Sequence, residues 1–226
     1  MIKILLLIMA VFMADRAAAE GGMEPAAQGI NLPAPPATGT MSLEGALAHR
    51  RSAREFVPGA LTLAEISRLA WAAQGITASE RRTAPSAGAT YPLEVYLVVG
   101  DAENLAAGVY RYLPRQHRLD AVAAGDIRLP LAAAALDQKW ISQAAMVVIF
   151  AAVFERTTAR YGLRGERYVH VEAGHAAQNL LLQAAALGLG ATPVGAFNDA
   201  EVSHLLHLPG SEKPLYIIPV GRIPKS

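Results

Sequence analysis

The sequence predicts one mixed domain of helices and strands, and three observations carry that prediction. The chain has 226 residues, of which 53% are hydrophobic, enough for one sizeable α/β domain with a substantial core. Residues 168–187 are apolar at nearly every position, which is typical of a helix buried on most of its circumference. The segments Leu93–Val99 and Gly108–Leu113 follow each other across a loop and indicate an antiparallel hairpin.

Composition and motifs exclude several classes of function. The net charge of +1 gives no field that would favour nucleic acid or an acidic partner. The sequence holds no cysteine, which removes disulfides, thiolate nucleophiles and iron–sulfur ligation. The histidine pairs 170/175 and 204/207 lack metal-ligand spacing and partners, so we expect no metal site. No P-loop, dinucleotide fingerprint, kinase or catalytic-triad pattern is present.

The N-terminal segment, residues 1–19, predicts an export signal. Lys3 is followed by an apolar run and then by the A-x-A cleavage pattern Ala17-Ala18-Ala19. That run is short for a bilayer span, although an uncleaved anchor is the alternative. We therefore expect a periplasmic or secreted protein with no stable membrane span after cleavage. Residues 20–41 are rich in Ala, Gly and Pro and predict a flexible linker, which leaves residues 42–226 as the folded domain.

An arginine–serine cluster follows the first predicted helix. That helix begins at Ser42 and is expected to carry Leu43, Ala46 and Leu47 inward. It runs into HRRSAREF, residues 49–56, where three arginines and a serine stand within five positions. Such a cluster is either a solvated surface or a phosphate site, because arginine offers a planar fork of donors.

Capping and strand signals predict the other elements in order. Thr62 and Glu65 form a capping box for a helix that ends at Gly75. Further along the chain, the patterns predict a strand at 117–122, a helix at 127–136, an apolar central strand at 145–153, a helix at 202–208 begun by Asn198, and a strand at 215–220.

Two irregular segments lie between these elements. TAPSAGATYP, residues 83–92, is either an ordinary turn or a place where a planar ligand lies on the backbone. Ser86 stands in no nucleophile-elbow motif. Residues 154–168 are the most polar part of the domain and are either a solvated helix and loop or the rim of a site presenting Arg160 and Tyr161.

The long helix carries one polar stripe and a glycine-rich exit. Glu172, His175, Asn179 and Gln183 recur at three- and four-residue spacings and therefore share a face. Gly188 and Gly190 stop the helix, and residues 192–197 predict a short strand through Gly195. A glycine inside a strand often marks the close approach of a ligand or another chain.

With RRSAREF, TAPSAGATYP, EAGHAAQNLLLQAAALGLGATPVGAF and the terminal PVGR in order, the chain from Ser42 to Arg222 resembles the FMN-dependent nitroreductase family. It is most similar to the subgroup of SagB-type dehydrogenases and thiazoline/oxazoline oxidases. The resemblance implies an α+β fold with a mainly antiparallel sheet flanked by helices. It also implies a homodimer, with the apolar circumference of the long helix, Tyr168–Leu187, at the interface.

The resemblance assigns the site residues to FMN. The arginine–serine segment and the terminal arginine would hold the phosphate, the small-residue loop would lie along the flavin from the partner subunit, and the segment after the long helix would face the ring, with an amide of Gly195 or Ala196 directed at N5. These positions are Arg50, Arg51, Ser52, Arg54 and Arg222; Pro85, Ser86, Ala87 and Gly88; and Pro193, Val194, Gly195 and Ala196.

The implied chemistry is a two-electron transfer through FMN by a ping-pong mechanism. A small reduced donor gives a hydride to flavin N5, and a small acceptor such as a nitroaromatic or quinone then takes the electrons. Tyr161 is expected at the pocket rim, in contact with the acceptor. Related azoline oxidases carry a Lys-Tyr pair where this chain has Arg160-Tyr161, and arginine cannot serve as a base.

Two alternatives remain beside that reading: a peptide azoline dehydrogenase, and a flavin-binding protein without turnover. Export would also separate the protein from cytoplasmic nicotinamide, so NAD(P)H and a different donor both stay open.

Overall fold

An antiparallel sheet forms the middle of the fold in the computed structural model, which describes residues 29–78 and 80–224. The predicted signal, residues 1–19, lies outside the described residues. The strands are β1 (Ile30–Asn31), β2 (Leu93–Val99), β3 (Gly108–Leu113), β4 (Arg118–Ala124), β5 (Met146–Ala152), β6 (Gly190–Ala191) and β7 (Lys213–Gly221). They lie in the order β1-β4-β3-β2-β5-β7-β6, so β6 is one edge of the sheet.

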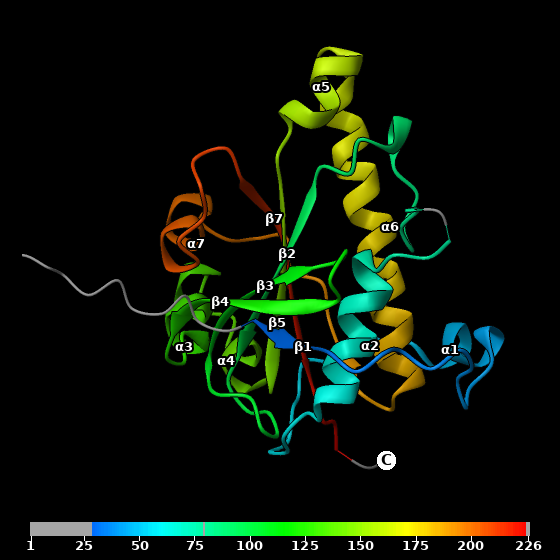
Figure 1. Cartoon of the computed structure of the whole chain (residues 1–226). Helices are drawn as coiled ribbons and strands as arrows, with labels where there is room; N and C mark the ends of the chain where they lie inside the picture. Colours follow the sequence, from blue (N-terminus) through cyan, green and yellow to red (C-terminus); the bar gives the residue numbers. More distant parts are fainter. Residues whose placement is uncertain (1–28, 79, 225–226) are drawn as a thin grey trace, which may run out of the picture.

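Helices cover both faces of this sheet (Figure 1). They are α1 (Leu43–His49), α2 (Leu63–Gln74), α3 (Arg128–Ala134), α4 (Trp140–Gln143), α5 (Glu155–Tyr161), α6 (Arg164–Ala186) and α7 (Asp199–Leu205), with a short 3-10 turn η1 at Ala87–Ala89. Figure 1 shows α1, α2 and α6 on one side of the sheet and α3, α4 and α7 on the other. The α+β prediction is confirmed.

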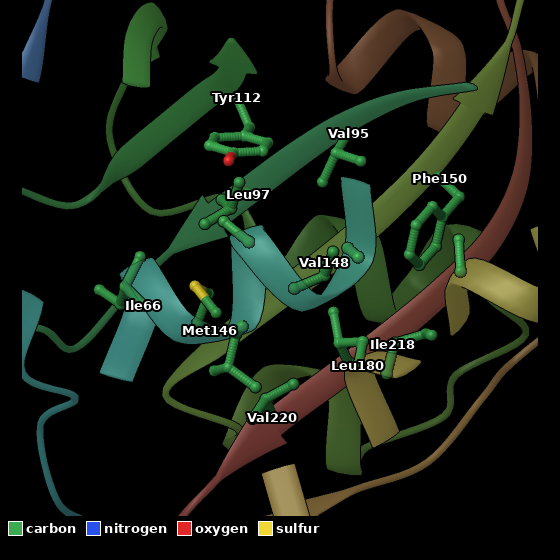
Figure 2. Packing of buried hydrophobic residues seen from close by; sticks show 14 of the residues in the cluster. Ile66, Val95, Leu97, Tyr112, Met146, Val148, Phe150, Leu180, Ile218 and Val220 are labelled. Carbon is green, nitrogen blue, oxygen red and sulfur yellow. The ribbon is translucent and has the colours of Figure 1, made fainter. Parts of the chain in front are cut away.

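Strand β5 is apolar throughout because it is buried on both faces. Val148 and Phe150 pack in the cluster that α2 and α6 cover, as Figure 2 shows, whereas Val147 and Ile149 pack under α3, α4 and α7. Successive side chains of a strand point to opposite faces, so two separate clusters result. Each fully buried aliphatic side chain contributes about 1.5–3 kcal/mol, so the burial of β5 on both faces stabilises the sheet.

The local signals for α2 are confirmed. The Thr62 hydroxyl accepts from the Glu65 amide at 3.2 Å, and the Thr62 amide donates to Glu65 Oε2 at 2.8 Å. Gly75 is the C-cap residue. Asn198 likewise caps α7, accepting from two amides of its first turn.

The prediction for the inward face of α1 is wrong in part. Ala46 is buried, but Leu43 and Leu47 are 62% and 53% exposed. This short helix packs mainly against α6, so only one of its faces is covered.

The predicted strand through Gly195 is also wrong. Only Gly190–Ala191 pairs with β7, and Val194 makes one isolated bridge with Ile217. Pro193 has no N–H to donate to a ladder, which explains why pairing stops there. Gly195 and Ala196 are exposed as a result.

The sheet begins inside the range predicted as a linker, residues 20–41. Ile30 and Asn31 pair with Leu119 and Arg118 of β4, and Leu32 is only 7% exposed. Alternating apolar residues in a Pro- and Ala-rich stretch were sufficient to cover the edge of β4. The folded part therefore starts earlier than Ser42.

The apolar side of α6 is covered by its own chain, which corrects the surface expected for a dimer. Its buried residues are Gly165, Val169, Glu172, Ala173, Ala176, Ala177, Leu180, Leu181 and Ala184. The exposed stripe is mixed instead, with Val171, Gly174, His175 and Gln178. Among the described residues, no helix combines the length and apolarity needed to cross a bilayer.

Candidate functional site

The C-terminal end of α1 borders a cavity of about 480 Å³, called the arginine cavity below. Arg50 and Arg51 line one side of it, and Gly190 and Ala191 of β6 line another. The Ala53 amide donates to Ala191 O at 3.1 Å, which holds the arginine segment against the sheet edge. The arginine–serine cluster predicted from the sequence is thus hydrogen-bonded to β6, the short strand that follows the glycine-rich end of α6.

The arginines of this segment have no carboxylate partner in the part of the chain that the structure describes. Within residues 29–78 and 80–224, no ion pair reaches Arg50, Arg51 or Arg54. Arg51 Nη1 donates only to backbone oxygens, those of Ala48 at 3.0 Å and Arg50 at 2.8 Å. Guanidinium groups without a carboxylate partner are a suitable donor set for a phosphate.

Two members of the predicted phosphate set point elsewhere. The Arg54 guanidinium lies 5.7 Å from the centre of the Trp140 ring. Arg222 donates to Glu65 at 2.6 and 2.8 Å and to Ala60 O at 2.9 Å. The structure therefore groups Arg50, Arg51 and Ser52 at the edge strand but commits the Arg222 side chain to Glu65.

Beyond β6, in the segment Pro193–Ala196, the backbone of Val194 is hydrogen-bonded to the sheet, whereas the backbone of Gly195 and Ala196 is exposed. Val194 exchanges two backbone hydrogen bonds with Ile217, at 2.8 and 3.0 Å. In the described chain, neither the Gly195 amide nor the Ala196 amide donates to a protein acceptor. A Cβ on Gly195 would meet only the Tyr216 ring, at 3.6 Å, so its own chain leaves room there. The exposed amides are available to a ligand.

A second group of residues, called the loop cluster, gathers around Pro85–Gly88. Arg160 Nη1 donates to Gly88 O at 3.1 Å, and a Cβ added to Gly88 would lie 2.6 Å from the Tyr161 hydroxyl. Gly88 has φ 59°, a conformation that favours glycine. Tyr161 packs edge-to-face on Tyr168, with ring centroids 5.2 Å apart. The structure thus brings Tyr161 to the predicted flavin loop.

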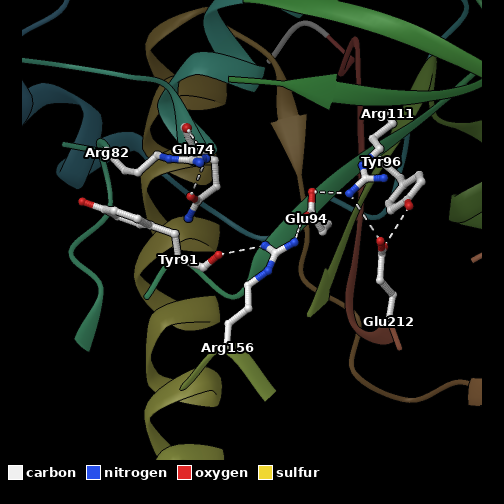
Figure 3. A network of polar contacts seen from close by, with 8 residues as sticks. All are labelled: Gln74, Arg82, Tyr91, Glu94, Tyr96, Arg111, Arg156 and Glu212. Atoms are coloured by element: carbon white, nitrogen blue, oxygen red, sulfur yellow. Dashed lines mark hydrogen bonds and ion pairs between the residues drawn. The ribbon is translucent and has the colours of Figure 1, made fainter. Parts of the chain in front are cut away.

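A network of ion pairs holds the residues that follow this loop (Figure 3). The Tyr91 amide donates to Ser86 Oγ at 2.9 Å, and Arg156 donates to Tyr91 O at 3.0 Å. Arg156 also pairs with Glu94 at 2.6 Å. Arg82 lies 5.0 Å from the centre of the Tyr91 ring and donates to Gln74. These contacts fix the segment that follows the loop cluster against β2, α2 and α5.

Glu172 of α6 lies beneath the loop and was not among the predicted site residues. Its side chain lines a cavity of about 280 Å³ with Pro85, Ser86 and Ala87. Burial raises the pKa of Glu172 to about 7, and the Ser86 hydroxyl and Arg82 only partly oppose that rise. The sequence signal that could have found it is an acid in an otherwise apolar helix, within the polar stripe already noted.

The arginine cavity and the loop cluster lie at different levels of α6. Leu181 and Ala185 border the first, whereas Tyr168 and Glu172 border the second. At 1.5 Å per residue, Glu172 and Leu181 are about 13 Å apart along the helix. In Figure 1, α1 lies by the C-terminal end of α6, and α5 lies by its start. One chain does not join the two groups into a single pocket.

No group of three or more His, Asp or Glu side chains in the described residues is arranged to hold a metal ion. The candidate site consists instead of cations, exposed amides and aromatic rings. Such a set can bind an anion and a flat ring but supplies little acid–base chemistry of its own.

The sequence model of the nitroreductase family matches residues 47–222, which include both groups of residues. The chain belongs to the nitroreductase family. A protein named as a nitroreductase, MJ1384 of Methanocaldococcus jannaschii, is 48% identical over 184 residues, which cover 80% of this chain and 91% of that protein. The microcin B17-processing protein McbC of Escherichia coli is 32% identical over 135 residues, 58% of this chain but only 50% of McbC. The predicted family and subgroup are confirmed.

Solved structures give the same picture of the fold. A nitroreductase-like protein of Ralstonia eutropha JMP134 superposes with a TM-score of 0.77 at 31% identity, covering 89% of this chain and 92% of that one. The NADPH:FMN oxidoreductase of Vibrio harveyi superposes with a TM-score of 0.59 at 20% identity, covering 81% and 69%. The second likeness concerns the fold alone.

Proposed function

We propose that this protein is an exported FMN-dependent oxidoreductase that passes two electrons from a small reduced donor to a small organic acceptor, such as a nitroaromatic or a quinone. One observation carries the proposal: Arg50 and Arg51, with no carboxylate partner in the described chain, stand at one end of β6, and the open amides of Gly195 and Ala196 follow at its other end. Membership of the nitroreductase family supports the class of reaction.

The spacing along the edge strand suits an elongated ligand with an anion at one end and a ring at the other. From Ala191 to Gly195 the chain spans at most about 13 Å, at roughly 3.3 Å per extended residue. Arg50, Arg51 and Ser52 would hold the phosphate of FMN, and Pro193–Ala196 would face its ring. The buried Thr192 hydroxyl, unpartnered within the described chain, stands between the two. Bound FMN supplies the two-electron chemistry.

The remaining predicted residues would come from a second copy of the chain. Two copies related by a two-fold axis perpendicular to α6 would run their α6 helices antiparallel. That arrangement carries the loop cluster of one copy toward the arginine cavity of the other. The exposed positions Gly174 and Gln178 of α6 would then lie at the interface. The separation of the two groups within one chain supports this homodimer.

The loop cluster would shape the entrance for donor and acceptor. Arg160 fixes the loop through Gly88 O, and the Tyr161 hydroxyl lies beside the same glycine. Tyr161 would contact the acceptor, while Arg160 contributes a permanent positive charge. Neither side chain is needed to hold the phosphate.

The absorption spectrum of the purified protein, followed by anaerobic reduction, tests the proposal. We expect a flavin spectrum that bleaches on chemical reduction and returns when a quinone or nitroaromatic is added without oxygen. Bound flavin that no acceptor re-oxidises would instead identify a binding protein without turnover. A protein that takes up no flavin after incubation with FMN would contradict the proposal.

The likeness to McbC favours one second candidate, a peptide azoline dehydrogenase. Arg160 does not fit an azoline dehydrogenase that needs a base at this position, because arginine does not release its proton. Incubation with an azoline-containing peptide and mass spectrometry would detect the loss of two hydrogens. Turnover by the native chain would favour this candidate, and turnover only by Arg160→Lys would favour the first.

Export is a separate part of the proposal and rests on residues 1–19. Expression of the full chain followed by cell fractionation and N-terminal sequencing tests it. The expected product is extracytoplasmic and begins at Glu20. A cytoplasmic product that retains Met1 would contradict export without touching the proposed chemistry.

A further inference from the structure

A small cavity beneath the loop cluster has mostly apolar walls and the buried Glu172 at its floor, with Ser86 and His175 as its other polar lining residues. Its volume is about 280 Å³, and Pro85, Ala87 and Val171 contribute apolar walls. The ring of Tyr168 forms a further wall and is held in place by the Tyr161 ring. A pocket of this composition accepts a small, flat and largely apolar molecule.

Glu172 supplies the polar group of that floor. Its side chain lines the cavity, although only 3% of the residue is exposed. Within the described residues, Glu172 Oε1 has no hydrogen-bond partner. A buried carboxyl oxygen without a partner carries a cost unless a ligand, a water molecule or a proton satisfies it.

The surroundings of Glu172 do not provide the cation that a buried carboxylate requires. Arg82 is the charged group whose field reaches it, but the Arg82 guanidinium is bonded to Gln74 and stacked near Tyr91. The Ser86 hydroxyl is a neutral donor whose hydrogen bond lowers the pKa of Glu172 in part. Tyr168 and His175 border the same cavity from α6 itself.

Charged groups on three of the elements that pack on α6 bind other partners. Glu65 of α2 pairs with Arg222, and Glu94 of β2 pairs with Arg111 and Arg156. From α5, Arg160 donates to Gly88 O, on the loop above. Because burial dominates, the pKa of Glu172 rises to about 7 and its carboxyl holds a proton through mildly acidic conditions.

We propose that this cavity binds the carbonyl oxygen of a small planar acceptor, such as a quinone, through a hydrogen bond donated by the neutral carboxyl of Glu172. The neutral acid offers one O–H donor and the walls offer apolar contact. The ionised acid offers no donor and repels the electron-rich oxygen. The inference rests on the proposed function, because it names where the acceptor of that reaction docks.

Binding of 1,4-naphthoquinone without any reductant tests the inference apart from turnover. Only the neutral form of Glu172 binds, so the dissociation constant should rise about 30-fold between about pH 5.5 and pH 8.5 for a pKa of about 7. Quenching of tryptophan fluorescence measures it, with flavin content recorded for each sample. A dissociation constant that does not change with pH would overturn the inference.

Matched variants identify the group responsible. Glu172→Gln keeps a donor but does not titrate, so it should bind the quinone with an affinity that is independent of pH. Glu172→Leu should lose binding at both pH values while remaining folded by circular dichroism. The control Glu166→Gln, on an exposed position of the same helix, should follow the wild-type pH profile. A Glu172→Gln protein that keeps the wild-type pH dependence, or that binds no quinone at any pH, would overturn the inference.

The two proposals fail separately. Quinone binding with the expected pH profile in a protein that takes up no FMN would contradict the proposed function and leave the cavity assignment standing. If quinone re-oxidises the flavin but quinone binding does not depend on Glu172, the cavity assignment is contradicted and the proposed function stands.

Discussion

Arg222 donates to both carboxylate oxygens of Glu65, at 2.6 and 2.8 Å, and so joins the end of the last strand to the start of α2. The same carboxylate accepts from the Thr62 amide and hydroxyl and thereby completes the capping box. Burial raises the pKa of Glu65, but the hydrogen bonds from Arg222 and Thr62 outweigh it and leave the pKa below its usual value. One side chain therefore caps a helix and fixes the C-terminal strand.

Glu65→Gln should lower the free energy of unfolding by about 2 kcal/mol near neutral pH, since it weakens a charge-assisted pair and a cap together. A depressed pKa contributes stability above the unfolded pKa, and that stability is lost as pH falls through the folded pKa. The difference between variant and wild type should therefore vanish in acid. Urea unfolding near neutral pH and in acid measures this difference in the free energy of unfolding. The exposed Glu55→Gln is the control, and equal stability of Glu65→Gln and wild type near neutral pH would contradict this account.

Tyr161→Phe removes the hydroxyl that lies beside Gly88 and keeps the ring that packs on Tyr168. Flavin content and stability should stay unchanged, while re-oxidation by a polar acceptor slows. The loss should reach roughly a hundredfold if the hydroxyl transfers a proton, and less if it only orients the acceptor. Stopped-flow re-oxidation measures the rate, with Tyr168→Phe as the control. Unchanged rates with every acceptor would remove Tyr161 from the site.

Local signals made much of the fold predictable from the sequence. The strand-like segments Leu93–Val99 and Gly108–Leu113, separated by a loop, predicted a hairpin at the bounds now observed. Thr62 with Glu65 predicted the start of α2. Each of these signals depends on neighbours in the chain. The exposure of Leu43 and Leu47, by contrast, arises because other elements cover only one face of α1. A local sequence pattern does not show which elements will pack on a helix.

The candidate site was predictable where residue type alone defines the chemistry. Arg50, Arg51 and the Gly88 loop stand out by composition, and the structure places the first two on one cavity. The commitment of Arg222 to Glu65 joins residues far apart in sequence, so no spacing could reveal it. Glu172 was noted as part of a stripe, but its burial beneath the loop follows only from packing.

Mixing two defective proteins tests whether the site is shared between copies. An Arg50→Ala/Arg51→Ala protein lacks the arginine cavity, and a Gly88→Val protein lacks a usable loop because its side chain meets the Tyr161 hydroxyl. Each alone should bind little FMN. After equal mixing and subunit exchange, half of the dimers are mixed and carry one intact site of two, so about a quarter of the wild-type flavin content should return.

Fluorescence titration after dialysis measures this recovery. Mixing each defective protein with itself is the control, and it should restore nothing. Failure to regain flavin after proven subunit exchange would contradict a site built from two copies.

The comparison of FMN with riboflavin tests the central claim most directly, because the two ligands differ only in the phosphate. Removing Arg50 and Arg51 eliminates charge-assisted bonds worth about 1.5–3 kcal/mol each, so FMN should bind at least about 100-fold more weakly to the double alanine variant. Riboflavin affinity should be nearly the same for variant and wild type, and Arg115→Ala, on an exposed pair with Glu80, should change neither. Equal losses for FMN and riboflavin, or none for either, would contradict a phosphate held in the arginine cavity.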